Sequence, residues 1–104
     1  MTGRLNKPFI TALVILATTG QAGAEDSDSR RAKALAFNCF TCHGTDGKSP
    51  GAMKSLHKLS ADEIRDKLEA FRRDENNPTI MNRIAKGYSD DEIAIIADYI
   101  ANLD

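Results

Sequence analysis

The sequence predicts an all-α fold of three or four helices, and two local patterns support this prediction. The segments Ser60 to Glu63 and Ser89 to Glu92 are both capping boxes. In such a box, a serine hydroxyl and a glutamate side chain pair with backbone N–H groups that otherwise lack partners at a helix start. Apolar residues recur at helical spacing after each box, and no window alternates between apolar and polar residues as a half-buried strand does.

The first helix should begin near Arg30 and end at two cysteines, Cys39 and Cys42. Before it, the acidic and hydroxyl-rich stretch 25–29 suits a frayed chain end better than a packed element. After it, glycines and a proline predict that 44–58 is an irregular loop.

Three further helical segments are expected after this loop. The second helix should end in the polar stretch 72–77, and a brief helical turn over 79–86 should end at Gly87. The second and last helices each present an apolar stripe to the core. The stripe residues are Ile64, Leu68 and Phe71 in the second helix, and Ile93, Ile96, Ala97 and Ile100 in the last.

The N-terminal segment has the organisation of a secretory signal peptide. Arg4 and Lys7 precede an apolar or hydroxyl-bearing run from Phe9 to Thr19, and Ala22-Gly23-Ala24 supplies the small residues that a signal peptidase accepts. We therefore predict that residues 1–24 are removed and that the protein is exported to the periplasm.

An uncleaved membrane anchor is the competing interpretation of the same segment. A spanning helix needs about 20 mostly apolar residues, and Gly20 and Gln21 end the run early. We therefore expect no stable membrane insertion after processing.

The predicted mature chain, 25–104, is one small and mildly acidic domain. Its 80 residues can bury only a modest share of their surface, so a disulfide, a metal or a large cofactor is expected to complete the core. Loss of Arg4 and Lys7 leaves 12 basic against 15 acidic residues, a net charge of −3. This balance argues against nucleic acid as a partner.

The segment Cys39-Phe40-Thr41-Cys42-His43 reads C-x-x-C-H, which is the attachment motif of c-type haem. Two thiols at this spacing can form thioether bonds to the two vinyl groups of one porphyrin. The adjacent His43 is then held beneath the iron as its proximal ligand. We predict one covalently bound haem c.

Three different uses of these residues compete with haem attachment. A thioredoxin-like redox pair requires a βαβ context, which the chain lacks. Structural zinc requires four ligands. The chain has only four cysteines and histidines, so a zinc site would need all of them: Cys39, Cys42, His43 and His57. A disulfide between the two cysteines closes too short a loop to stabilise the domain much, and it leaves His43 unexplained. Export, helix content and the small core together favour haem.

A second axial ligand should come from a methionine, because a thioether stays bound to haem iron and raises its potential. Met81 lies 38 residues after His43, in a short segment between two capped helices that can pass round the porphyrin edge, and it is the favoured ligand. Met53 follows His43 too closely in the loop, so ordinary core packing is expected for it. Ligation by His57 and an open axial position are less favoured arrangements of the distal side.

Apolar residues should wall the haem or the core behind it and keep water from the ring. Arg83 and Lys86 are candidate partners of the haem propionates. The expected wall residues are Leu35, Phe37, Leu56, Leu59, Ile64, Leu68, Ile80, Ile84, Tyr88, Ile93 and Ile96.

Several of these segments together resemble the haem subunit of flavocytochrome c sulfide dehydrogenase, within the wider class I cytochrome c group. The resemblance covers roughly 32–103, and its specific parts are Cys39 to Gly47, Ala52-Met53, Thr79 to Asp90 and the last helix. It implies a small class I cytochrome c fold of three to four helices wrapped around one haem. It also implies that this polypeptide transfers electrons and has no catalytic site of its own. Its electrons would come from an FAD-containing flavoprotein that oxidises sulfide.

The resemblance implies that Met81 is the distal iron ligand. The family tends to place a proline after the alanine-methionine pair, where its carbonyl can orient the proximal histidine. Lys54 stands at that position here. The sequence therefore leaves open which carbonyl receives the second ring nitrogen of His43.

Periplasmic one-electron transfer is the expected function, as the haem subunit of such a flavoprotein. The first competing function is a free soluble shuttle that docks briefly with other periplasmic redox proteins. The second is catalysis or gas sensing at the iron, which requires an open axial position, and ligation by Met81 argues against it.

Overall fold

The computed structural model describes residues 2–3, 8, 14–15, 22–75 and 77–104, and in these residues it contains α-helices, one short 3-10 helix and no strand. The all-α prediction is confirmed. Most of the predicted signal peptide lies outside the described residues. The elements are α1 (Ala22–His43), η1 (Thr45–Gly47), α2 (Ala61–Arg72), α3 (Ile80–Ala85) and α4 (Asp90–Ala101).

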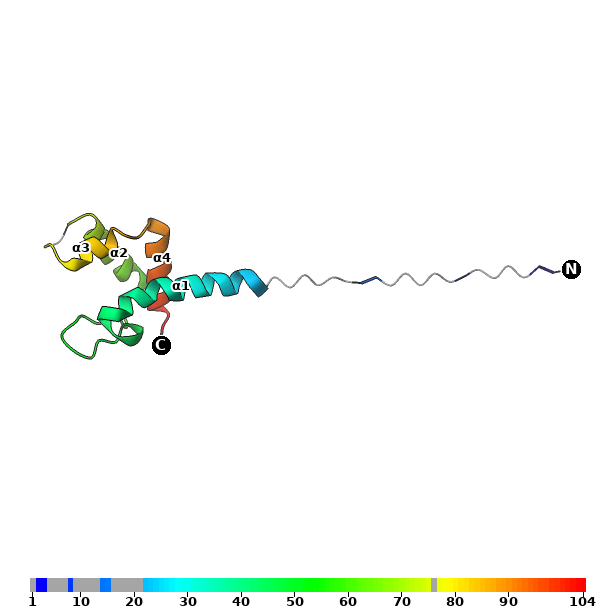
Figure 1. Cartoon of the computed structure of the whole chain (residues 1–104), viewed down its shortest axis with the longest axis horizontal. Coiled ribbons are helices and arrows are strands. Elements are labelled where there is room, and N and C mark those ends of the chain that lie inside the picture. Colours follow the sequence, from blue (N-terminus) through cyan, green and yellow to red (C-terminus); the bar gives the residue numbers. More distant parts are fainter. Residues whose placement is uncertain (1, 4–7, 9–13, 16–21, 76) are drawn as a thin grey trace.

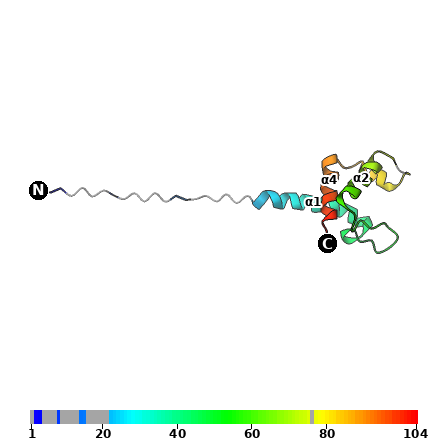
Figure 2. The same ribbon diagram turned by 180° about the vertical axis from the view of Figure 1, so that it is seen from behind.

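Helix α1 is longer than the sequence patterns predicted. It begins at Ala22 instead of near Arg30, and the stretch 25–29, expected to be frayed, is helical. No glycine or proline interrupts 25–29, so this stretch can continue a helical backbone. The first turns of α1 project away from the other helices (Figures 1 and 2).

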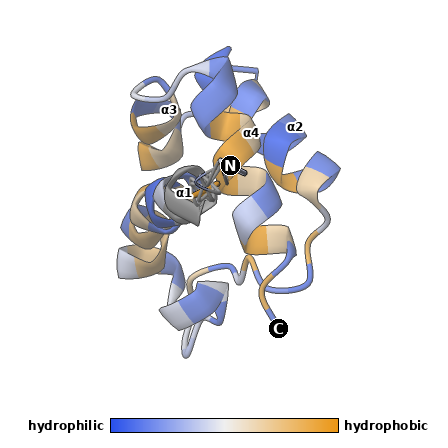
Figure 3. Cartoon of the chain, turned by 90° about the vertical axis from the view of Figure 1, so that its right-hand side faces the viewer, coloured by the Kyte–Doolittle hydropathy of each residue, from blue (hydrophilic) through white to orange (hydrophobic). Residues whose placement is uncertain are grey.

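Helix α4 forms the centre of the domain. It packs against both α1 and α2, and α3 packs against α2. Figure 3 shows the apolar part of α4 within the helix cluster. The predicted stripe is confirmed, because Ile93, Ile96, Ala97 and Ile100 are all buried. Ala36 of α1, Ile64 and Leu68 of α2, and Ala85 of α3 complete the buried apolar core.

The predicted wall residues separate into three groups. Ile64, Leu68, Ile93 and Ile96 are buried, and Leu35, Leu56, Leu59 and Tyr88 are partly buried against them. Phe37, Ile80 and Ile84 are 64%, 71% and 37% exposed, so they are not part of the protein core.

Two fully buried alanines, Ala36 and Ala85, were not among the predicted core residues. Alanine adds little to a hydrophobic pattern, and its burial depends on how closely two helices approach each other. That approach is a property of the packed structure.

The two predicted capping boxes are both formed. In the first, Glu63 N–H donates to Ser60 Oγ at 3.1 Å, and Ser60 N–H donates to Glu63 Oε2 at 2.8 Å. In the second, Glu92 N–H donates to Ser89 Oγ at 3.2 Å, and the glutamate side chain accepts from the backbone of Ser89 in return. Each box marks the start of the helix that the sequence predicted.

The first capping box should make stability depend on pH through Glu63. Hydrogen bonds from the Ser60 backbone N–H and then from its side chain lower the pKa of Glu63. A lowered pKa contributes stability that is complete above the ordinary glutamate value of about 4.3 and is lost as pH falls through the folded-state value. Urea unfolding from pH 7 to pH 3 should therefore show a difference between wild type and Glu63→Gln that shrinks on acidification. A difference that stays constant with pH would contradict this origin.

Candidate functional site

The predicted attachment motif lies in the last turn of α1. Cys39 is half-buried and Cys42 is exposed, and both are free thiols. Residues three apart share one face of a helix, so the two sulfurs are presented on the same side. Burial raises the pKa of the Cys39 thiol, and a backbone hydrogen bond partly offsets that effect. The competing disulfide is therefore not formed, and both thiols are free to bond to one planar cofactor.

His43 ends α1 and makes one contact that settles the role of its ring nitrogens. Its Nδ1 lies 2.5 Å from the carbonyl oxygen of Lys54. A carbonyl only accepts, so Nδ1 carries the proton and donates it. In a neutral imidazole, Nε2 is then left with the lone pair that a metal needs. The carbonyl that the sequence left open is therefore that of Lys54, the residue at the proline position of the resembling family.

Two glycines shape the chain immediately after His43. Gly44 has a φ of +89°, and a Cβ at this residue would lie 2.1 Å from the Lys48 carbonyl oxygen. Gly47 has a φ of +74°, and a Cβ there would lie 3.0 Å from the Cβ of Leu56. Left-handed backbone and close approach both favour glycine. These residues let the chain reverse at once and return toward α1.

Backbone hydrogen bonds then close the loop that presents the Lys54 carbonyl. The Gly47 carbonyl accepts N–H groups from Leu56 at 2.8 Å and from His57 at 3.1 Å. Within the loop, Ser49 N–H donates to Ser55 Oγ at 2.9 Å. These bonds hold the residues on both sides of Lys54, so its carbonyl has a defined position.

The two candidate methionines lie in different surroundings. Met53 is 50% exposed, so the prediction that it packs in the core is wrong. The closure of its loop at Gly47 and Leu56 keeps 48–55 outside the helix cluster. Met81 lies on α3, is partly buried and packs against the core.

A third capping box, which the sequence patterns did not identify, starts α3 at Thr79. Met81 N–H donates to Thr79 Oγ1 at 3.1 Å, and Thr79 N–H donates to Asn82 Oδ1 at 3.0 Å. The signal was present as Thr-x-x-Asn, with an asparagine in place of the usual glutamate or glutamine. Asn82 is a buried polar residue, 5% exposed, and its Nδ2 donates to Asp74 Oδ1 at 2.9 Å.

Exposed apolar side chains lie on the two helices that carry the candidate ligands. Phe37 is on α1, and Ile80 and Ile84 are on α3. Apolar side chains of this size fit the face or edge of a large apolar cofactor. Of the candidate propionate partners, Arg83 is exposed, whereas Lys86 Nζ donates to Asp74 Oδ2 at 2.6 Å.

The structure does not gather the cysteines and histidines into the competing zinc site. Among the described residues, no three His, Cys, Asp or Glu side chains form a group that could hold a metal ion. His57 is partly buried in the loop region, and its backbone N–H is used in closing that loop.

Within the residues that the structure describes, no helix combines the length and apolar character needed to cross a membrane.

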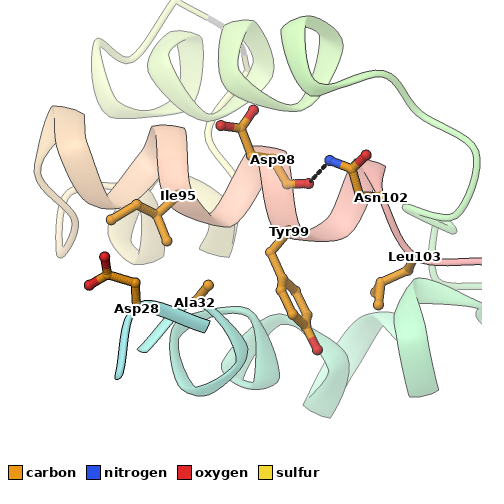
Figure 4. Close-up of a pocket in the computed structure, with 7 residues that line it drawn as sticks. All are labelled: Asp28, Ala32, Ile95, Asp98, Tyr99, Asn102 and Leu103. Carbon is orange, nitrogen blue, oxygen red and sulfur yellow. Dashed lines mark hydrogen bonds between the residues drawn. The ribbon is translucent and has the colours of Figure 1, made fainter. Parts of the chain in front are cut away.

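A surface depression of about 420 Å³ lies between α1 and α4, apart from the candidate ligands (Figure 4). The Asn102 side chain donates to the Asp98 carbonyl at 2.7 Å on its rim. The depression is lined by Asp28, Ala32, Ile95, Asp98, Tyr99, Asn102 and Leu103.

Comparison with known proteins agrees with the geometry of this site. The family model described as Cytochrome c matches residues 29–104. The cytochrome subunit of sulfide dehydrogenase from Chlorobaculum tepidum is 38% identical over 90 residues, which cover 84% of this chain and 82% of that protein. Cytochrome c-553 from Helicobacter pylori is 35% identical over 99 residues, covering 93% and 98%.

A more distant similarity involves a longer protein. The thiosulfate dehydrogenase electron acceptor of Stutzerimonas stutzeri is 38% identical over 69 residues, which cover 62% of this chain and 32% of that protein. The family match spans most of α1 and all of α2, α3 and α4, and it includes the C-x-x-C-H motif. The chain therefore belongs to the cytochrome c family, as a class I c-type cytochrome that transfers electrons through one covalently bound haem c.

Proposed function

We propose that this cytochrome is a periplasmic one-electron carrier in which Cys39 and Cys42 attach the haem and His43 and Met81 bind its iron. One observation carries the proposal: the Lys54 carbonyl engages Nδ1 of His43 at 2.5 Å, which leaves Nε2 for the metal. The haem supplies an iron that alternates between the ferric and ferrous states.

The chain's own residues have distinct tasks in this arrangement. The Lys54 carbonyl fixes the orientation of the His43 ring and increases the basicity of Nε2. His43 and Met81 would hold the iron from the protein side, and the thioether of Met81 would raise the reduction potential. Phe37, Ile80 and Ile84, which are exposed on the polypeptide, would contact the porphyrin and keep water from it. We place no catalytic residue on this chain, because the electron moves without a bond to substrate.

The proposed electron donor is a flavin-containing, sulfide-oxidising subunit. Two observations support this partner: the resemblance of Thr79 to Asp90 to the haem subunits of such enzymes, and the similarity to a protein named as a sulfide dehydrogenase cytochrome subunit. The leader-like segment 1–24 and the haem attachment motif support a periplasmic location.

A free soluble shuttle is the second candidate function. The similarity to cytochrome c-553 of Helicobacter pylori, over 93% of this chain and 98% of that protein, favours it. The two functions differ in whether the cytochrome stays bound to one partner or docks briefly with several.

Replacement of Met81 tests the distal ligand. Met81→Ala should abolish the weak red absorbance that sulfur ligation of ferric iron produces, while the haem stays attached. Met53→Ala is the matched control, because Met53 is 50% exposed in a loop, and it should keep the band. An unchanged band in Met81→Ala together with a lost band in Met53→Ala would move the ligand to Met53.

Replacement of either cysteine tests covalent attachment. Cys39→Ala and Cys42→Ala should each lower the yield of protein whose intact mass includes the haem. The remaining chain should lose helix content, because the haem supplies part of its interior. Thr41→Ala, between them in the motif, should keep full attachment. Normal helix content without haem would contradict the role of haem in folding.

Purification of the native protein separates the two candidate functions. A flavin-containing chain should co-purify with the cytochrome at a fixed ratio through size exclusion at moderate salt. A cytochrome that elutes alone, with its electrons accepted equally well from unrelated donors, would favour the free shuttle.

A further inference from the structure

Helix α3 carries Met81 but is too short to hold its own position. It has six residues, and isolated helices of this length are unstable in water because nucleation is unfavourable. Helix α3 packs against α2. The position of Met81 therefore depends on contacts between α3 and the rest of the domain, above all α2.

The Asp74 carboxylate makes two polar contacts with this segment from the turn that follows α2. Its Oδ1 accepts a hydrogen bond from Asn82 Nδ2 at 2.9 Å, and its Oδ2 accepts one from Lys86 Nζ at 2.6 Å. Asn82 lies within α3, and Lys86 is the residue at its C-terminal cap. One carboxylate therefore ties α2 to two points along a short helix.

The Asn82 side chain extends this connection to the start of α3. While its Nδ2 donates to Asp74, its Oδ1 accepts the Thr79 N–H at 3.0 Å. Thr79 Oγ1 in turn accepts the Met81 N–H at 3.1 Å. Because Asn82 is only 5% exposed, loss of Asp74 would leave its buried amide nitrogen without an acceptor, which is unfavourable.

Asp74 is itself held firmly at the end of α2. Its backbone N–H donates to the Phe71 carbonyl at 3.1 Å, and its φ of +55° is one that aspartate tolerates better than most residues. Hydrogen bonds from Lys86 and then from Asn82 lower the pKa of Asp74, so the carboxylate is ionised at neutral pH.

We propose that Asp74 is a positioning residue that holds Met81 on the haem iron by fixing α3 through Asn82 and Lys86. This inference rests on the proposed ligation of iron by Met81. A thioether is a neutral ligand that an external base can displace when α3 moves away. Asp74 therefore sets how often the distal position opens.

Binding of imidazole to the ferric cytochrome tests this role, because imidazole must displace the distal ligand. Asp74→Ala should bind imidazole about tenfold more tightly than wild type. Loss of the hydrogen bonds to the charged Asp74 carboxylate lowers the free energy needed to move α3 and displace Met81. Asp74→Asn keeps an acceptor for Asn82 and loses the ion pair with Lys86, so its affinity should lie between the two. It also provides a milder variant should Asp74→Ala fold poorly.

Asp62→Ala, in the first turn of α2, is the matched control. Asp62 is exposed and pairs with Arg65 at 2.5 Å, so its loss also removes a surface ion pair but leaves α3 untouched. Imidazole affinity in this variant should equal that of wild type. An equal increase in Asp62→Ala and Asp74→Asn would overturn the positioning role, since general destabilisation would then explain both.

Met81→Ala, measured in the same titration, tests the ligation of iron by Met81 separately from the positioning role of Asp74. It should bind imidazole at least as tightly as Asp74→Ala. If Met81→Ala binds like wild type, the proposed ligation itself is wrong, and the positioning role falls with it. If only Met81→Ala gains affinity and both Asp74 variants match wild type, ligation stands and the role of Asp74 is refuted.

Discussion

The hydrogen bond between His43 Nδ1 and the Lys54 carbonyl is the constraint on which the rest of the site depends. It joins the last residue of α1 to the loop that follows and selects the ring nitrogen that faces a metal. Its geometry requires the chain to reverse at Gly44 and Gly47, both in the left-handed region. A proline at position 54 is not needed for this contact, because hydrogen bonds donated by backbone N–H groups before and after Lys54 hold the carbonyl instead.

The two proposed iron ligands, His43 and Met81, are held in place in different ways. His43 belongs to a long helix that packs against α4, and a backbone carbonyl fixes its ring. Met81 belongs to a six-residue helix that is held by apolar packing at Ala85 and by the Asp74 carboxylate after α2. A local opening of the domain should therefore begin at α3, the shortest α-helix among the described residues.

The protein core is small for a domain of this length. Ile93 and Ile96 are its largest fully buried side chains, and both belong to α4. Phe37, Ile80 and Ile84 remain exposed on the protein, although they lie on the helices that carry the candidate ligands. A covalently bound porphyrin supplies the apolar surface that such side chains lack within the polypeptide. Folding and haem attachment should thus be coupled in this chain.

Sequence alone determined the helical class, the starts of α2 and α4, and the haem motif, because capping boxes and C-x-x-C-H are local patterns in which neighbouring residues interact. It misjudged Met53 and the start of α1, and it missed Ala36, Ala85 and the capping role of Asn82. Burial, the partner of His43 at Lys54 and the link from Asp74 to α3 were decided only by the tertiary structure. These features depend on residues that are separated in the chain and meet only after helices and loops pack together.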